Sequence, residues 1–121
     1  MKFYCYKKCS TCKKAAAFLR ARGVKFEEID YTEQPLTAKE LHTYWQVSDL
    51  PLKKFFNTSG LLYREMDIKD KLLTMTEDEQ LELLARHPML VKRPILVTDD
   101  AILVGFNETR WTSTLNKEDQ S

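Results

Sequence analysis

Two cysteines separated by two residues lie where a predicted strand meets a predicted helix, and this junction constrains the fold more than any other feature. The segment Phe3–Tyr6 is short and aromatic, as is typical of a strand. From Ser10 to Arg22, apolar residues recur at helical spacing and indicate one buried face: Cys12, Ala15, Ala16 and Leu19. The sequence therefore predicts a strand, the pair Cys9-x-x-Cys12, and a helix whose first turn holds the second cysteine.

A second strand follows this helix closely. Gly23 ends the helix, and Lys25–Tyr31 resembles a strand with Phe26 and Ile29 as its apolar residues. A β-α-β unit of about 30 residues requires its two strands to be parallel.

The middle of the chain is predicted to be helical. Thr37 with Glu40, and Thr76 with Glu79, form capping-box patterns, each of which opens a leucine-containing helical segment. Between them, the stretch LPLKKFFNTSG indicates a short helix that ends in a turn at Gly60.

The chain closes with two short apolar runs, Ile95–Val97 and Ile102–Val104. Asp99-Asp100 between them favours a hairpin turn. Asn107 is suited to cap a last short helix, and residues 116–121 are expected to form a disordered polar tail.

The order β-α-β, helices, β-β-α predicts a single α/β domain over residues 1–121. Its core is a four-stranded mixed sheet, with a helical insertion at about residues 36–91 between the second and third strands.

Composition excludes several classes of protein. No apolar run approaches the roughly 20 residues that span a membrane, and the N-terminus lacks a secretory signal, so a cytoplasmic location is expected. Eight basic residues and no acidic ones precede Glu27, although the net charge is +1. These basic residues indicate either a solvated helix face or a cationic setting for a thiolate or an anionic substrate; no motif for direct nucleic-acid binding is present.

The cysteine pair suits redox chemistry. Unpaired N–H groups, the helix dipole and nearby lysines all favour a thiolate at the start of a helix. The helical pattern directs Cys12 toward the core and leaves Cys9 at the exposed tip. We therefore expect Cys9 to attack a disulfide and Cys12 to resolve the mixed disulfide, forming a Cys9–Cys12 disulfide; the alternative is that both cysteines only pack.

Neither a metal site nor a bound cofactor is predicted. The spacing of Cys5, Cys9 and Cys12 resembles a cluster-binding loop, but Cys5 belongs to the strand and cannot converge with the other two. A zinc site needs four ligands, and His42 and His87 have no ligand spacing with their neighbours. Cys5 is interpreted as a core residue, with a regulatory second disulfide as the alternative.

Arg93-Pro94 precedes the third strand. A proline that begins a strand is ordinarily trans, whereas in a thioredoxin-like fold a proline at this place is cis and faces the redox helix. We expect a cis bond, with Pro94, Ser10 and Thr11 lining the substrate cleft. Arg93 is then expected to steady the Cys9 thiolate or an oxyanion, although a plain surface arginine needs no such role.

Four stretches, FYCYKKCSTCKKA, LKKFFNTSGLLYREMDIKDKL, ARHPMLVKRPILV and VGFNE, occur in this order along nearly the whole chain. Together they resemble the arsenate-reductase-like (ArsC/Spx) family of thioredoxin-fold proteins, and most closely its small C-x-x-C members. The resemblance implies a cytoplasmic redox protein with a cis proline at Pro94.

The resemblance implies two activities, and the sequence departs from both. Glutathione/glutaredoxin-linked arsenate reductases carry their catalytic cysteine at the position of Cys9 and hold the oxyanion with three arginines. Arg93 matches one of these, but Asn57 and Gly105 occupy the other two positions, which disfavours arsenate reduction. Spx-type regulators use a C-x-x-C switch and bind the C-terminal domain of the RNA polymerase alpha subunit, but FFNTSGLLYREMD is unlike their equivalent segment.

The leading functional hypothesis is therefore a thiol–disulfide oxidoreductase that needs no bound cofactor. Its catalytic residues are predicted to be Cys9, Cys12 and Arg93, and its electrons are expected from thioredoxin or from glutathione/glutaredoxin. The alternative is a redox-sensing regulator that binds the RNA polymerase alpha subunit, and arsenate reduction comes third.

Overall fold

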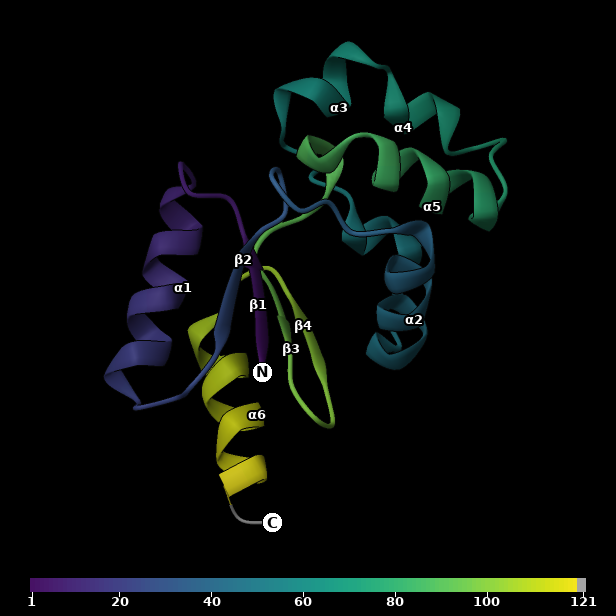
Figure 1. Ribbon diagram of the computed structural model, residues 1–121. Helices are drawn as coiled ribbons and strands as arrows, with labels where there is room; N and C mark the ends of the chain where they lie inside the picture. Colours follow the sequence, from purple (N-terminus) through teal and green to yellow (C-terminus); the bar gives the residue numbers. More distant parts are fainter. Residues whose placement is uncertain (120–121) are drawn as a thin grey trace. The chain divides into compact units, whose positions relative to one another are not determined.

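A mixed four-stranded sheet forms the centre of the first of two compact units in the computed structural model (Figure 1), which describes residues 1–119. The strand order is β2-β1-β3-β4. β1 pairs in parallel with β2 and antiparallel with β3, which pairs antiparallel with β4. The predicted α/β fold with a mixed sheet is confirmed, and the strands are β1 (Lys2–Cys5), β2 (Glu27–Asp30), β3 (Ile95–Val97) and β4 (Ile102–Val104).

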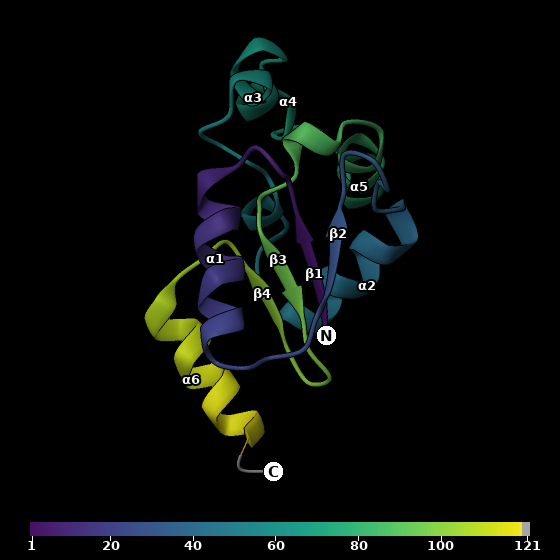
Figure 2. The same ribbon diagram turned by 60° about the vertical axis from the view of Figure 1, so that its left-hand side comes forward.

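Helices α1 (Ser10–Ala21) and α6 (Glu108–Asp119) pack on one face of this sheet, as the view in Figure 2 shows. Trp111 of α6 is fully buried, and its ring meets Phe3 of β1 and Phe18 of α1 edge to face at centroid distances of 6.4 Å. Such aromatic pairs contribute about 0.5–1.5 kcal/mol each beyond the burial of their area. The core therefore fixes α1, and with it the two cysteines, against the sheet.

The predicted periodicity of α1 is confirmed. The buried residues of this helix are the four expected ones, Cys12, Ala15, Ala16 and Leu19. Gly23 has a φ of 70°, a left-handed conformation that costs glycine little, and the helix ends just before it. The N–H of Gly23 donates to the carbonyl of Arg20 at 3.0 Å, so the turn satisfies an end group of the helix.

The second compact unit, Tyr31–Lys92, supplies the predicted helical insertion between β2 and β3. Both predicted capping boxes are present, at Thr37 with Glu40 and at Thr76 with Glu79. The elements of this unit are α2 (Ala38–Ser48), η1 (Leu52–Phe55), α3 (Leu61–Glu65), α4 (Ile68–Lys71), α5 (Glu77–Arg86) and η2 (Pro88–Leu90), where η denotes a 3₁₀ helix. The prediction that the whole chain is one domain stays a prediction.

Two parts of the second unit differ from expectation. The predicted helix in LPLKKFFNTSG is one 3₁₀ turn, after which the N–H of Gly60 donates to the carbonyl of Asn57 in the expected turn. The short helices α3 and α4 were not predicted. Asp67 separates them with a φ of 55°, a left-handed conformation that a short polar residue tolerates.

The end of the chain is partly as predicted. The hairpin is confirmed, and the Thr98 hydroxyl accepts from the N–H groups of Asp100 and Ala101. Asn107 caps α6 by accepting from the N–H of Arg110 at 2.9 Å.

The expected short final helix and disordered tail are wrong for residues 116–119, which belong to the twelve-residue α6; residues 120–121 lie outside the described part. Buried Leu115 anchors this end of the helix. The Asn116 side chain accepts from Arg22, the C-cap residue of α1, at 2.6 Å, so a polar residue there still has a partner. Among the described residues, no helix has the length and apolar character needed to cross a membrane.

Candidate redox site

Cys9 is the N-cap residue of α1, in a tight turn that follows β1. Its N–H donates to the carbonyl of Tyr6 at 3.0 Å, and its carbonyl accepts from Lys13 at 3.1 Å, the first bond of the helix. The backbone is extended at this position, and the side chain is half-buried. The Cys9 sulfur thus lies where the free N–H groups of the first turn leave the helix positively polarised.

The surroundings of Cys9 lower the pKa of its thiol. Burial alone would raise this pKa, but interactions that stabilise the thiolate outweigh burial. They come from the backbone N–H of Cys12, from the guanidinium of Arg93, and from the thiol of Cys12. Hydrogen bonds to the charged form and an adjacent cation both favour ionisation, so Cys9 carries more thiolate at neutral pH than an ordinary cysteine.

Cys12 has the opposite character. It is buried in the core beneath the first turn, where its sulfur accepts from the N–H of Tyr6 at 3.4 Å. The pKa of Cys12 is raised to about 12, chiefly by burial and in smaller part by the neighbouring Cys9, while the N–H of Tyr6 opposes the rise. Cys12 is therefore a neutral thiol that can donate to the anionic sulfur of Cys9. Cys5, Cys9 and Cys12 are all free thiols.

Arg93 reaches the site from the segment before β3. Its guanidinium carbon lies 5.2 Å from the centre of the Tyr6 ring, a cation–π contact that orients the side chain. The Arg93-Pro94 peptide bond is cis, as predicted, and Pro94 is buried. The Pro94 carbonyl accepts from the N–H of Gly105 at 2.8 Å, which ties this segment to the end of β4.

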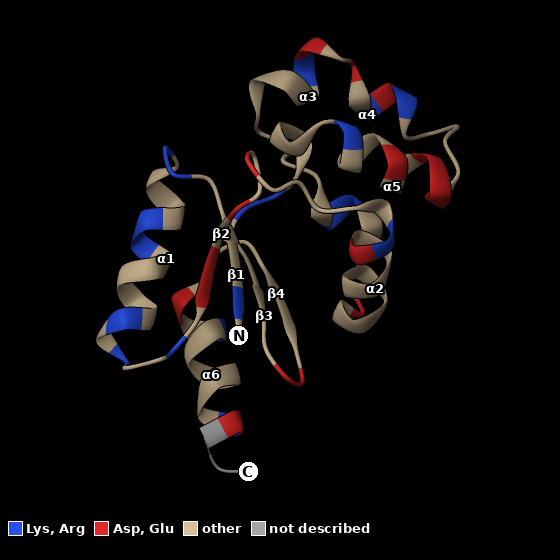
Figure 3. Cartoon of the chain, in the orientation of Figure 1, with Lys and Arg blue, Asp and Glu red and all other residues tan. Residues whose placement is uncertain are grey.

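Basic residues are frequent in and beside the segment that holds the cysteine pair. Ser10 and Thr11, between the two cysteines, are exposed, so this end of α1 is open to solvent. Figure 3 shows basic and no acidic residues along α1. The exposed lysines in or next to the cysteine segment are Lys7, Lys8, Lys13 and Lys14.

Comparison with known proteins decides the family. The model of the ArsC family matches residues 4–114. The chain belongs to the ArsC family.

Proteins similar to this chain carry different functional names. The chain is 50% identical over 109 residues to the uncharacterized protein YusI of Bacillus subtilis (strain 168), covering 90% of this chain and 92% of YusI. It is 26% identical to the global transcriptional regulator Spx of Streptococcus pyogenes serotype M1, over 91% of this chain and 81% of Spx.

A solved structure from Streptococcus mutans UA159, described as a possible arsenate reductase, is 43% identical with a TM-score of 0.81. The match covers 88% of this chain and 90% of that one. Membership of the ArsC family supports a thiol-based redox protein in general, because its named relatives include both regulators and reductases.

ArsC-type arsenate reductases are expected to carry arginine at two positions besides that of Arg93. In this chain, one of them is Gly105, which lies in a bend. Gly105 has a φ of 74°, which strains a residue that has a side chain. Both backbone groups of Gly105 are hydrogen-bonded. Its N–H donates to the Pro94 carbonyl, and its carbonyl accepts from the indole N–H of Trp111 at 3.0 Å. Asn57, at the other position, lies in the second unit.

Sequence reasoning missed two residues of this ArsC-family site. Tyr6 orients Arg93 through its ring and contacts Cys12 through its N–H. Glu28 of β2 lies beside Cys5, a contact considered below. Glu28 lies near Cys5 because β1 and β2 pair in parallel. The sequence of either strand alone does not predict this contact. Among residues 1–119, no group of three or more His, Cys, Asp or Glu side chains could hold a metal ion.

Proposed function

We propose that the protein is a thiol–disulfide oxidoreductase with Cys9 as nucleophile and Cys12 as resolving thiol. One observation supports this most strongly: the N-cap residue of α1 carries a thiol with a lowered pKa, and a buried thiol with a raised pKa follows it three residues later. Attack on a disulfide requires a thiolate, and the site favours that form at Cys9 alone of the pair.

The reaction consists of two exchanges. The Cys9 thiolate attacks one sulfur of a substrate disulfide, forming a mixed disulfide and releasing the other sulfur as a thiolate that takes up a proton. Cys12 then loses its proton and attacks the Cys9 sulfur, which releases the second substrate thiol and leaves a Cys9–Cys12 disulfide. While both thiols are free, Cys9 raises the pKa of Cys12. Once Cys9 is held in the mixed disulfide this effect is lost, so Cys12 ionises more readily.

Arg93 and Pro94 are proposed to shape the substrate cleft together with Ser10 and Thr11. The guanidinium stabilises the Cys9 thiolate before attack and again when that sulfur is released. A thiol donor of the thioredoxin or glutathione/glutaredoxin class returns the pair to the reduced state, and no bound cofactor is required. A cytoplasmic location, where such donors keep thiols reduced, is part of the proposal.

Turnover of a disulfide substrate tests this function. With a small artificial disulfide and a thiol donor, we expect turnover in the native protein and none in Cys9→Ser. Cys12→Ser should instead accumulate the mixed disulfide on Cys9, visible as an added mass. The exposed Ser113→Ala is the matched control and should keep full activity. Equal turnover in the native protein and Cys9→Ser contradicts the proposal.

A redox-sensing regulator is the second candidate, because Spx and the regulatory protein MgsR of Bacillus subtilis (29% identical) are relatives. In this case the Cys9–Cys12 disulfide would change a surface that binds the C-terminal domain of the RNA polymerase alpha subunit. Binding to that domain that changes on oxidation, without disulfide turnover, favours this candidate. Arsenate reduction comes third, because Gly105 and Asn57 supply no cation where arginines are expected; arsenate-dependent consumption of the thiol donor would support it.

A further inference from the structure

A third thiol, that of Cys5, lies in the same part of the core as the redox pair. Cys5 is the last residue of β1, and alternation along the strand puts its side chain on the same face as that of Phe3. Phe3, Cys5 and Cys12 belong to one buried cluster, and Cys9 packs against it. The end of β1 and the first turn of α1 therefore gather three sulfur atoms.

One hydrogen bond places the Cys12 sulfur next to the backbone of Cys5. The N–H that donates to the Cys12 sulfur at 3.4 Å is that of Tyr6, and this group belongs to the peptide bond that joins Cys5 to Tyr6. The Cys12 sulfur therefore lies beside the Cys5–Tyr6 peptide bond, and both thiols belong to the same buried cluster.

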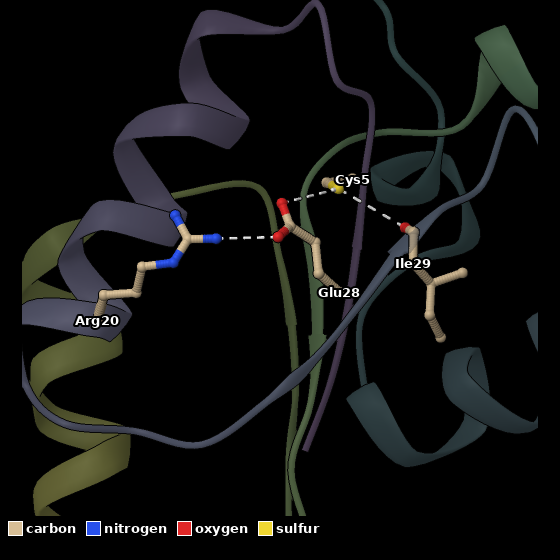
Figure 4. Close-up of polar contacts among 4 residues, drawn as sticks. All are labelled: Cys5, Arg20, Glu28 and Ile29. Carbon is tan, nitrogen blue, oxygen red and sulfur yellow. Dashed lines mark hydrogen bonds and ion pairs between the residues drawn. The ribbon is translucent and has the colours of Figure 1, made fainter.

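Cys5 also has a proton acceptor. Figure 4 shows its sulfur between the carboxylate of Glu28, at 3.8 Å, and the carbonyl of Ile29, at 3.6 Å. Arg20 of α1 donates to the other carboxylate oxygen of Glu28 at 2.9 Å and fixes its orientation. A carboxylate held beside a buried thiol can take the proton when that thiol becomes a nucleophile.

We propose that Cys5 is a second resolving thiol, which attacks the Cys12 sulfur of the Cys9–Cys12 disulfide. This inference rests on the proposed function, which supplies that disulfide. Glu28 accepts the Cys5 proton, the Cys5–Cys12 bond forms, and the Cys9–Cys12 bond breaks with Cys9 leaving as a thiolate. One disulfide replaces another, so no further oxidant or reductant is consumed.

The difference between the thiol pKa values of Cys5 and Cys9 favours the exchange toward the Cys5–Cys12 disulfide. Burial, with the nearby Glu28 and Asp30 carboxylates, raises the pKa of Cys5 to about 12, whereas that of Cys9 is lowered. A thiol of low pKa is the better leaving group, and its thiolate is the more stable product. The exchange therefore removes a thiol that ionises poorly and frees the one that ionises well.

The consequence is that the oxidised state is stored in the core while the surface thiolate is restored. Cys5 and Cys12 are 2% and 3% exposed, so a disulfide between them is shielded from a bulky reductant. Cys9 stays available to react again with a thiol or a disulfide at the start of α1. The protein would hence hold two distinct oxidised forms, one surface-accessible and one buried.

Tryptic peptides distinguish these two forms. Cleavage after Lys2, Lys7, Lys8 and Lys13 releases Cys5 in the peptide 3–7 and both Cys9 and Cys12 in the peptide 9–13. We would oxidise the native protein with oxidised glutathione, stop exchange with acid, block free thiols by alkylation, digest, and follow both peptides by mass spectrometry over time.

We expect an internal disulfide in peptide 9–13 first, followed by a linked pair of peptides in which Cys9 is alkylated. Glu28→Gln should slow the second step by at least about tenfold, while the exposed neighbour Glu27→Gln should not. If Cys5 stays alkylated while the internal disulfide accumulates, the inference is wrong and the proposed function stands. If neither disulfide forms, both are wrong.

Discussion

Cys9 and Cys12 are the same residue type three positions apart, yet the fold drives the acidity of their thiols in opposite directions. Cys9 lies at the start of the helix with N–H groups and a guanidinium around it, and its pKa falls. Cys12 lies one turn deeper among alanine and leucine side chains, and its pKa rises to about 12. The proposed division into an attacking and a resolving thiol rests on this difference in burial and charge.

Replacing Arg93 with alanine should reduce the reactivity of Cys9. A hydrogen bond to a charged group contributes about 1.5–3 kcal/mol, less where solvent screens it, so we expect the thiolate fraction at neutral pH to fall roughly three- to tenfold. The measurement is the rate of Cys9 alkylation by iodoacetamide at neutral pH, with peptide mapping to confirm the site.

Arg86→Ala is the control for this prediction, because Arg86 is an exposed arginine at the end of α5 in the second unit. It should leave the alkylation rate unchanged. Equal rates in Arg93→Ala and the native protein would mean that the guanidinium does not stabilise the thiolate.

At the scale of elements, local sequence signals identified most of the fold. Short aromatic or apolar stretches located the four strands, and helical spacing located α1 and α5. The two capping boxes are formed with both of their hydrogen bonds. These features depend on contacts within a few residues, which a sequence displays directly.

The missed elements depend on distant contacts instead. Helices α3 and α4 have five and four residues, too short for periodicity to reveal, and they are held by packing of Tyr63 and Ile68 in the second unit. The last turn of α6 has a polar sequence, but Arg22, the C-cap residue of α1, supplies a partner for Asn116. Tertiary contacts there overrode the expectation of disorder.

The capping box of α2 offers a test of an element's stability. Thr37 accepts from the N–H of Glu40, and the Glu40 carboxylate accepts in return from the N–H of Thr37, each at 3.0 Å. Thr37→Ala removes the first bond and should lower the free energy of unfolding by about 1 kcal/mol. Urea titration of the reduced protein measures this as a lower midpoint with an unchanged slope.

The exposed Thr109→Ala in the first turn of α6 is the matched control, since no cap depends on its hydroxyl; Asn107 provides that cap. Its effect should stay within about 0.5 kcal/mol. Equal losses in the two variants would show that the box contributes nothing to stability.

At the scale of the whole molecule, the buried thiols couple stability to pH. The pKa of Cys5 is raised to about 12, against about 8.5 in the unfolded chain. Between these values the folded protein holds a proton that the unfolded chain has lost. The contribution of Cys5 is therefore complete below the unfolded pKa and is lost as pH rises toward the folded one.

We expect the reduced protein to lose stability more steeply than Cys5→Ala does as pH rises above about 8.5. The difference in slope should be about 1.4 kcal/mol per pH unit. Cys9 does not oppose this loss of stability at high pH. Because folding lowers the pKa of Cys9, this residue makes stability depend on pH only below the pKa that it has in the unfolded chain. Urea titrations at several pH values under a reductant measure the slopes, and parallel slopes for the two proteins would refute the assignment.

The candidate site could be predicted only in part. The C-x-x-C spacing identified Cys9 and Cys12, and the family resemblance pointed to Arg93 and the cis bond before Pro94. The contacts of Tyr6 with Arg93 and of Glu28 with Cys5 join residues from separate elements, and only the folded chain reveals them.

The pKa of the Cys9 thiol is the quantity on which the proposed function depends most directly. It can be measured as the thiolate absorbance of the reduced native protein against pH, with the Cys9→Ser signal subtracted. We predict a value below the roughly 8.5 of an ordinary cysteine. A value at or above it would contradict the role of Cys9 as the attacking nucleophile.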